Sequence, residues 1–151
     1  MLNSPVVIDS SVFSKLFLDE SDSDLAVEFF TALVERGIKM VAPTLFLYEI
    51  FNVAHHYHLP PSEIFGLLEK YRLSNLTLIN PSEKHLAKAG EICKVGHVKN
   101  GFPSFYDAIF HAIACLEKGI LVTADKKYTE KTKSFKHICM LSEAYFNIRN
   151  V

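Results

Sequence analysis

Short apolar runs alternate along the whole chain with segments long enough to form helices. Five runs rich in valine, isoleucine and leucine predict strands at residues 6–8, 39–42, 76–79, 120–123 and 138–141. Between them, apolar residues recur every three or four positions, which predicts helices at residues 11–18, 25–35, 44–58, 62–73, 81–95 and 105–118. This alternation is typical of a parallel sheet with helices on both faces. We therefore expect an α/β fold, a three-layer α/β/α sandwich around a mostly parallel five-stranded sheet.

The length of the chain predicts one domain over residues 1–151. Hydrophobic residues make up 49% of the sequence, which is enough for a substantial core, yet no segment is apolar enough for a membrane helix. The three cysteines lie far apart without a CxxC pair, so we expect neither a disulfide framework nor a cysteine zinc site. Residues 1–5 lack the pattern of a signal peptide. Together these features predict a cytoplasmic protein without membrane association.

The charge of the chain is unevenly distributed. Residues 1–75 contain 10 acidic and 5 basic residues, a formal charge of −5, whereas residues 76–151 contain 7 acidic and 11 basic residues, a charge of +4. A solvated face explains most charge runs, but an asymmetry of this size also suits a surface that meets a polyanion.

Four carboxylates occupy positions that a parallel sheet would bring together. Asp9 directly follows the first predicted strand, and Asp125 follows the fourth. Glu49 and Asp107 lie within apolar helical segments, where a carboxylate needs a compensating charge. Ligands gather at the carboxyl ends of parallel strands, and carboxylate oxygens suit Mg²⁺ and Mn²⁺. The four acids therefore predict a metal site at this edge of the sheet.

Each acid also has a purely structural interpretation. Asp9 and Asp125 precede helices and suit the N-cap position, and Ser104 with Asp107 fits a capping box. Glu49 fits the polar edge of an amphipathic helix. For one acid alone the structural role is the more frequent one. The convergence of all four favours a shared site, and a carboxylate held at a helix start is well oriented to bind a metal.

The segments that carry these acids resemble, in order, the motifs of PIN-domain nucleases. They are Val-Val-Ile-Asp-Ser-Ser at 6–11, the stretch 43–52 around Glu49, Ser-Phe-Tyr-Asp-Ala at 104–108 and Val-Thr-Ala-Asp at 122–125. The closest subgroup is that of the VapC toxins of toxin–antitoxin pairs. The resemblance implies a PIN-like fold, metal-dependent cleavage of RNA with Mg²⁺ or Mn²⁺, an antitoxin protein as partner and a homodimer.

The resemblance also assigns roles to individual residues. Four acids are expected to bind the metal and to be catalytic: Asp9, Glu49, Asp107 and Asp125. Three hydroxyl residues are expected to orient those carboxylates: Ser11, Ser104 and Thr123. Because an acidic pocket alone would repel RNA, flanking lysines are expected to contact its backbone: Lys94, Lys99, Lys126 and Lys127.

Other candidate sites are weaker. His55 and His58 have the spacing of a zinc site but lack a third ligand, and His111 and Cys115 suit a packed core. The GxSxG, P-loop and GxGxxG signatures of serine hydrolases, nucleotide hydrolases and dinucleotide enzymes are absent.

Two other functional classes remain for comparison. A phosphoacceptor receiver domain needs a pair of acids after its first strand, whereas here Asp9 is followed by two serines. The second class is a PIN-fold module that binds RNA or protein without catalysis. The four acids favour the nuclease, and the affinity for Mn²⁺ would separate the two.

Overall fold

Five parallel strands form a single sheet in the computed structural model, which describes residues 4–96, 98–99 and 101–150. The strand order is β3-β2-β1-β4-β5, and every neighbouring pair is parallel. The strands are β1 (Val6–Ile8), β2 (Met40–Pro43), β3 (Leu76–Ile79), β4 (Ile120–Thr123) and β5 (Ile138–Met140). The predicted α/β architecture is therefore confirmed, with a described sheet that is entirely parallel.

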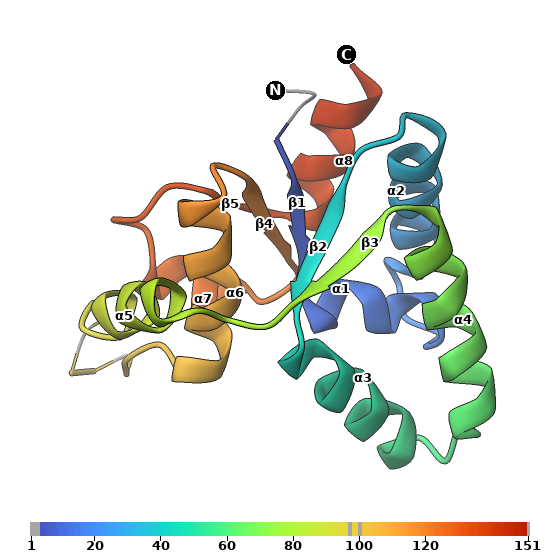
Figure 1. Cartoon of the computed structure of the whole chain (residues 1–151), viewed down its shortest axis with the longest axis horizontal. Coiled ribbons are helices and arrows are strands. Elements are labelled where there is room, and N and C mark those ends of the chain that lie inside the picture. The colour runs from blue at the N-terminus through green and yellow to red at the C-terminus, as the bar shows by residue number, and fades with distance from the viewer. Residues whose placement is uncertain (1–3, 97, 100, 151) are drawn as a thin grey trace.

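Helices cover both faces of this sheet, so the molecule has three layers (Figure 1). The helices are α1 (Ser10–Phe13), the 3₁₀ turn η1 (Ser14–Leu16), α2 (Ser23–Glu35), α3 (Leu45–His56), α4 (Pro61–Ser74), α5 (Glu83–Ile92), α6 (Phe105–Leu116), α7 (Lys126–Lys131) and α8 (Leu141–Arg149). Helices α5 and α6 lie on one side of the sheet, and α2 and α4 lie on the other (Figure 1). No described helix is both long and apolar enough to cross a membrane.

The core is built on β1, the central strand, whose Val7 and Ile8 are fully buried. Phe13, at the end of α1, lies at the centre of an aromatic cluster. Its ring contacts those of Phe30 and Phe46 edge-on, with centroids 5.7 and 5.2 Å apart. These contacts join α1 to α2 and α3 and hold α1 against the end of β1.

The carboxyl ends of β1 and β4 lie side by side. Ile8 is paired with Val122, and the backbone N–H of Asp9 donates to the Val122 carbonyl at 3.1 Å. The residues that follow these two strands therefore emerge at the same edge of the sheet, where ligands of open α/β sheets bind.

Candidate active site

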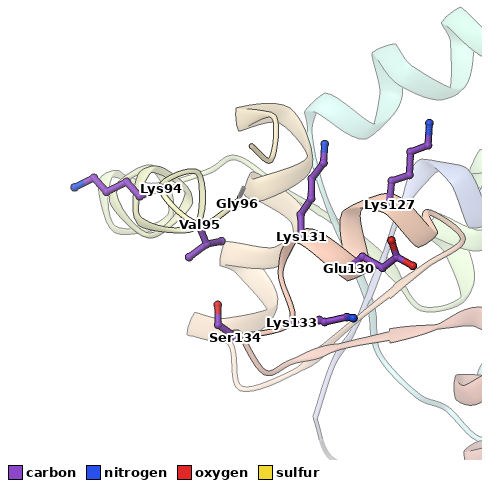
Figure 2. A pocket seen from close by; sticks show the side chains of 8 residues that line it. All are labelled: Lys94, Val95, Gly96, Lys127, Glu130, Lys131, Lys133 and Ser134. Atoms are coloured by element: carbon purple, nitrogen blue, oxygen red, sulfur yellow. The ribbon is translucent and has the colours of Figure 1, made fainter. Parts of the chain in front are cut away.

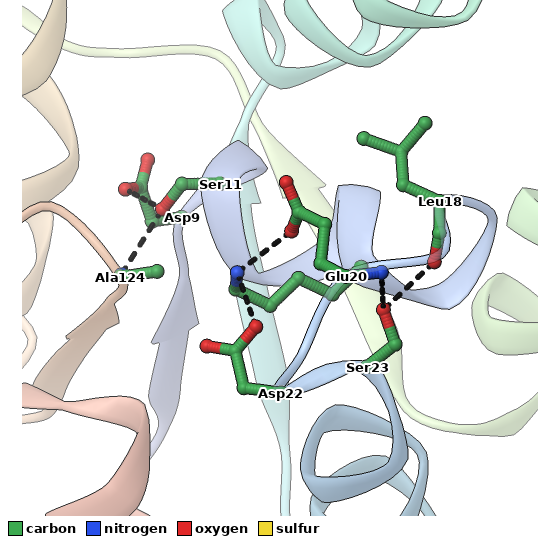
Figure 3. Close-up of polar contacts among 8 residues, drawn as sticks. Asp9, Ser11, Leu18, Glu20, Asp22, Ser23 and Ala124 are labelled. Carbon is green, nitrogen blue, oxygen red and sulfur yellow. Dashed lines mark hydrogen bonds and ion pairs between the residues drawn. The ribbon is translucent and has the colours of Figure 1, made fainter.

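Asp9 is held in place by hydroxyl groups from both sides of this edge. Its Oδ2 accepts hydrogen bonds from Ser11 Oγ and Thr123 Oγ1, each at 2.6 Å. Ser11 Oγ in turn accepts from the backbone N–H of Ala124 at 3.1 Å (Figure 3). The ends of β1 and β4 thus share one hydrogen-bonded network around a single carboxylate, to which both Ser11 and Thr123 donate.

The environment of Asp9 disfavours its negative charge. Burial raises the pKa of the Asp9 carboxyl, the hydroxyls of Ser11 and Thr123 oppose this effect, and the charges of Asp107 and Asp125 raise the pKa further. The net result is a pKa above the usual aspartate value. An ionised Asp9 is therefore costly here unless a cation compensates it.

Glu49 lies on α3 and is held by Ser10, the first residue of α1. Ser10 Oγ donates to Glu49 Oε2 at 2.5 Å. Burial raises the pKa of Glu49 to about 7, the bond from Ser10 opposes this effect, and the charges of Asp9 and Asp107 add to it. Ser10 has no role in the sequence-based prediction, because its partner is known only once α1 and α3 are packed together.

Asp107 lies in the first turn of α6, beside its N-cap residue Ser104. Ser104 Oγ accepts from the backbone N–H of Asp107 at 3.1 Å and donates to Asp107 Oδ2 at 2.8 Å. The capping role of Ser104 is thus confirmed, and the same hydroxyl orients the carboxylate.

The capping interpretation separates the two strand-end aspartates. Asp125 caps α7, since its Oδ1 accepts from the backbone N–H of Tyr128 at 3.0 Å. Asp9 occupies the N-cap position of α1, but its side chain makes no capping bond. The N-cap interpretation is therefore confirmed for Asp125 and wrong for the side chain of Asp9.

The donor chemistry of the four acids fits a hard divalent cation, but their present geometry is not a formed metal site. In residues 4–96, 98–99 and 101–150, no three or more histidine, cysteine, aspartate or glutamate side chains are placed to hold a metal ion. The reason is visible in the hydrogen bonds, because each of the four carboxylates is turned toward its own hydroxyl or amide donor. Without a cation, such neutral donors relieve the mutual repulsion of the acids.

The histidines take structural positions. His55 and His58 are exposed at the end of α3 and belong to no metal-binding group among the described residues. His111 is fully buried, with its ring nitrogens 3.1 Å from Tyr128 Oη and 2.7 Å from the Lys136 carbonyl oxygen. It packs as a core residue, and burial lowers its pKa.

A lysine-rich cleft of about 810 Å³ lies between the loop after α5 and helix α7 (Figure 2). It is lined by Lys94, Val95, Gly96, Lys127, Glu130, Lys131, Lys133 and Ser134. Of the lysines predicted to contact RNA, Lys94 and Lys127 line this cleft, whereas Lys99 and Lys126 are exposed without being among its lining residues.

Lys131 and Lys133 belong to the run of lysines that follows Asp125 in the sequence. The sequence leaves a solvated surface and a contact with the RNA backbone equally open for this run, and the structure places both lysines in the cleft.

A second hollow, of about 570 Å³, is lined by Glu49 and Glu20, by Ser11 and Ala124 of the network around Asp9, and by one lysine. Its lysine, Lys15, is buried and paired with Glu20 at 2.8 Å and Asp22 at 2.7 Å (Figure 3). Burial lowers the pKa of Lys15, but the bonds to Asp22 and Glu20 outweigh it and raise the pKa overall. The positive charge of Lys15 is thus neutralised within the fold.

Several solved structures share this fold. The protein PAE2754 of Pyrobaculum aerophilum is 19% identical with a TM-score of 0.64, covering 100% of this chain and 92% of its own. A toxin–antitoxin complex from Klebsiella pneumoniae gives 18% identity and a TM-score of 0.61, covering 90% of this chain and 97% of the other. VapC20 of Mycobacterium tuberculosis, a sarcin–ricin loop cleaving toxin, gives 13% identity and a TM-score of 0.65, covering 83% of this chain and 93% of the other.

No curated protein matches the chain in sequence. The family profile described as PIN domain matches residues 6–133, from the start of β1 to beyond α7. This match spans every acid and hydroxyl residue described above. The chain therefore belongs to the PIN domain family.

Proposed function

We propose that this PIN-domain chain is a ribonuclease that hydrolyses RNA phosphodiester bonds with Mg²⁺ or Mn²⁺. The observation that carries the proposal is the environment of Asp9. Two hydroxyls from separate segments fix this carboxylate at the end of β1, while burial and two neighbouring aspartates make its charge costly. A buried carboxylate whose charge destabilises the fold is expected to have a function, and binding of a cation directly compensates that charge.

Asp9, Glu49, Asp107 and Asp125 would hold the cation in this proposal. A divalent ion bound there would stabilise negative charge on the phosphate and lower the pKa of the attacking water. Ser11 and Thr123 keep Asp9 oriented, and the hydroxyls of Ser10 and Ser104 do the same for Glu49 and Asp107. Formation of the site requires these carboxylates to turn from their present donors toward a common ion.

The test is cleavage of total RNA by the purified chain, with Mn²⁺, with Mg²⁺ and with EDTA, followed by mapping of new RNA ends. Discrete ends that appear only with metal are expected. Asp107→Asn is expected to remove them, whereas the matched variant Asp24→Asn, at an exposed aspartate on α2, is expected to retain them. Metal-independent cleavage, or full cleavage by Asp107→Asn, would contradict the proposal.

We further propose that the chain is the toxin of a toxin–antitoxin pair, acting in the cytoplasm as a single-domain homodimer with an antitoxin protein as partner. The similarity in fold to structures described as a toxin–antitoxin complex and as a toxin supports this narrower role. Co-expression provides the test, since growth arrest by the chain alone should be relieved by a neighbouring gene product. Growth unaffected by the active chain would contradict the toxin role.

The alternative is a PIN-fold module that binds RNA or protein without catalysis. The observation that favours it is the absence of a formed metal-binding group among the described residues. Calorimetric titration with Mn²⁺ separates the two functions. Binding that is lost in Asp9→Asn supports the nuclease, and no binding to the wild type supports the silent module.

A further inference from the structure

The lysine cleft carries an inference that rests on the proposed ribonuclease function and deepens it. We propose that this cleft binds the backbone of an unpaired RNA segment on one side of the scissile bond, the side of α7. Among the residues that the structure describes, four lysines and one glutamate are the charged residues that line it: Lys94, Lys127, Glu130, Lys131 and Lys133. Lysine ammonium groups on flexible stems contact phosphates without reading sequence.

The cleft adjoins the acids. Lys127 lies two residues after Asp125, in the helix that Asp125 caps. At the other wall, Lys94 follows Cys93, whose thiol pKa is raised by burial and also by the charge of Asp107. The α7 wall of the cleft is therefore close to the proposed site, and a strand bound at the acids can continue into the cleft.

The lysines of α7 present their charges together. Lys127 and Lys131 lie one helical turn apart, and their ammonium groups point in the same direction in Figure 2. A Cβ atom built on Gly101 would be 3.7 Å from Lys131 Nζ, so this ammonium lies close to the loop before α6. The two lysines thus form one face of the cleft rather than two separate surface charges.

Exposed aromatic rings next to the cleft and next to Asp107 favour an unpaired strand. Phe102 is 53% exposed, and its ring lies against Gly96, a lining residue, where a Cβ atom would be 2.8 Å from it. Tyr106, 65% exposed, directly precedes Asp107. Exposed rings stack with unpaired bases, whereas the base faces of a duplex are already covered. An acidic protein segment would use the lysines but would not need these rings.

Strands β2 and β4 flank β1, so α3, which follows β2, and α7, which follows β4, begin on either side of Asp9. The charge of the hollow on the α3 side explains why the backbone would be held on one side. There the hollow beside Glu49 contains Glu20, and its Lys15 is already neutralised by two carboxylates. A phosphate entering that hollow would gain little attraction. We therefore expect the RNA to be anchored through the nucleotides on the α7 side.

The first experiment measures binding in EDTA of a fluorescent single-stranded RNA of twelve nucleotides, by anisotropy at 50–200 mM salt. The test variant is Lys127→Gln/Lys131→Gln. Its matched control is Lys39→Gln/Lys70→Gln, which removes the same charge at exposed sites outside the cleft. Loss of two phosphate contacts should lower the log–log salt slope by about 1.4. Between 50 and 200 mM salt, the fold-decrease in RNA affinity should therefore be about seven times smaller for the test variant than for the wild type.

A wild-type slope and affinity in the test variant would overturn the proposal and leave the cleft to another ligand, such as an acidic segment of a partner protein. Absence of RNA binding by the wild type at 50 mM salt would also overturn it. Phe102→Leu should weaken binding of the single strand with an unchanged salt slope. Equal binding of single strand and duplex by the wild type would contradict the stacking step.

The second experiment tests the side, using RNAs shortened from either end around a mapped cut. Shortening one flank should lower kcat/KM of the wild type but not of Lys127→Gln/Lys131→Gln, and shortening the other flank should affect neither. Equal losses from both flanks would overturn the one-sided arrangement. The binding experiment needs no cleavage. A protein that binds RNA in the cleft without cleaving it would contradict the ribonuclease function but not the cleft, whereas a nuclease whose binding does not depend on these lysines would contradict the cleft alone.

Discussion

Asp9 illustrates the conflict between function and stability at the scale of one residue. Its carboxylate is partly buried, bonded to two hydroxyls and adjacent to other acids that raise its pKa. Asp9→Asn keeps an oxygen that can accept from Ser11 and Thr123 but removes the charge. We expect the metal-free variant to be more stable by on the order of 1 kcal/mol, or about 2–4 °C in Tm, and to lose metal-dependent cleavage.

Thermal unfolding in EDTA at pH 7 and the RNA cleavage assay check the two parts of this prediction. Asp24→Asn, at an exposed aspartate of α2, serves as the control and should change neither Tm nor cleavage appreciably. A Tm below that of the wild type would show that the charge of Asp9 does not destabilise the fold.

His111 gives a prediction of pH dependence. Its ring is fully buried, bonded to Tyr128 and to the Lys136 carbonyl, and its pKa is lowered by burial, with Lys88 and His137 adding positive charge. In the unfolded chain the imidazole of His111 binds a proton near pH 6.5, whereas in the folded chain it stays neutral at that pH. The contribution of His111 to stability is therefore full above about pH 6.5 and falls as the pH decreases, by up to about 1.4 kcal/mol per pH unit. Glu49, whose pKa is raised to about 7, contributes in the opposite direction, so the effect of His111 is measured as a difference between the wild type and a variant.

Urea unfolding between pH 5 and pH 8 measures this slope. His111→Gln is expected to be less stable than the wild type at pH 8, because core packing is lost, and this difference in stability should become smaller toward pH 5. His55→Gln, at an exposed histidine, should keep the wild-type pH profile. A difference between His111→Gln and the wild type that does not change with pH would show that His111 does not contribute to the pH dependence.

The limits of sequence-based prediction are clear for these residues. Asp9 could be predicted because it directly follows a strand, and Ser11 and Thr123 because their motifs resemble those of the family. Ser10 could not, since its contact with Glu49 depends on how α1 and α3 pack together.

At the scale of elements, the strands agree with the predicted ranges within one residue, because each is a short apolar run buried in a parallel sheet. The first predicted helix, residues 11–18, instead divides into α1 and η1. No range was predicted for α7 or α8. Helix α7 is short and rich in lysine, so it has little apolar periodicity, and its start depends on the Asp125 cap.

Two glycines provide a matched test of element packing. Gly119 precedes β4, and a Cβ atom there would lie 2.2 Å from the Pro5 carbonyl oxygen, which accepts from the Ile120 N–H. Gly119→Ala must displace β4 from β1 and should lower stability by about 1–3 kcal/mol. Gly66 lies within α4 with open space around its Cβ position, so Gly66→Ala should raise stability by about 0.5–1 kcal/mol. Chemical denaturation measures both, and equal effects of the two substitutions would contradict this account of Gly119.

At the scale of the whole molecule, the acidic and basic halves of the sequence contribute to two different hollows on the surface. The acidic half contributes Glu20 and Glu49 to one hollow, and the basic half contributes all the lysines of the cleft. Net charge alone, at −1, would have argued against a polyanionic substrate. In the proposed function, this segregation of charge would allow a nearly neutral chain to attract RNA on one side.

The last prediction concerns assembly, for which the resemblance implies a homodimer through the segments 45–57 and 64–71. The fold directs part of these segments inward, since Phe46, Ile50 and Tyr71 are buried in the core. Tyr48 remains 75% exposed, and Tyr57 and Phe65 are each 55% exposed, so a partner copy could cover these rings. Light scattering at about 50 μM, above the roughly micromolar Kd of a modest interface, should give a mass about twice 17.1 kDa for the wild type.

The double variant Tyr57→Ser/Phe65→Ser should be monomeric under the same conditions, because it removes exposed rings without opening the core. Phe146→Ser, which removes a ring 67% exposed on α8, should remain dimeric and excludes a general effect of surface polarity. A wild-type monomer would contradict the dimer itself. A dimer that persists in the double variant would place the interface on another face of the molecule. Dissociation of the dimer by Phe146→Ser would place the interface on α8, and the partner copy would then cover the face formed by α2 and α8.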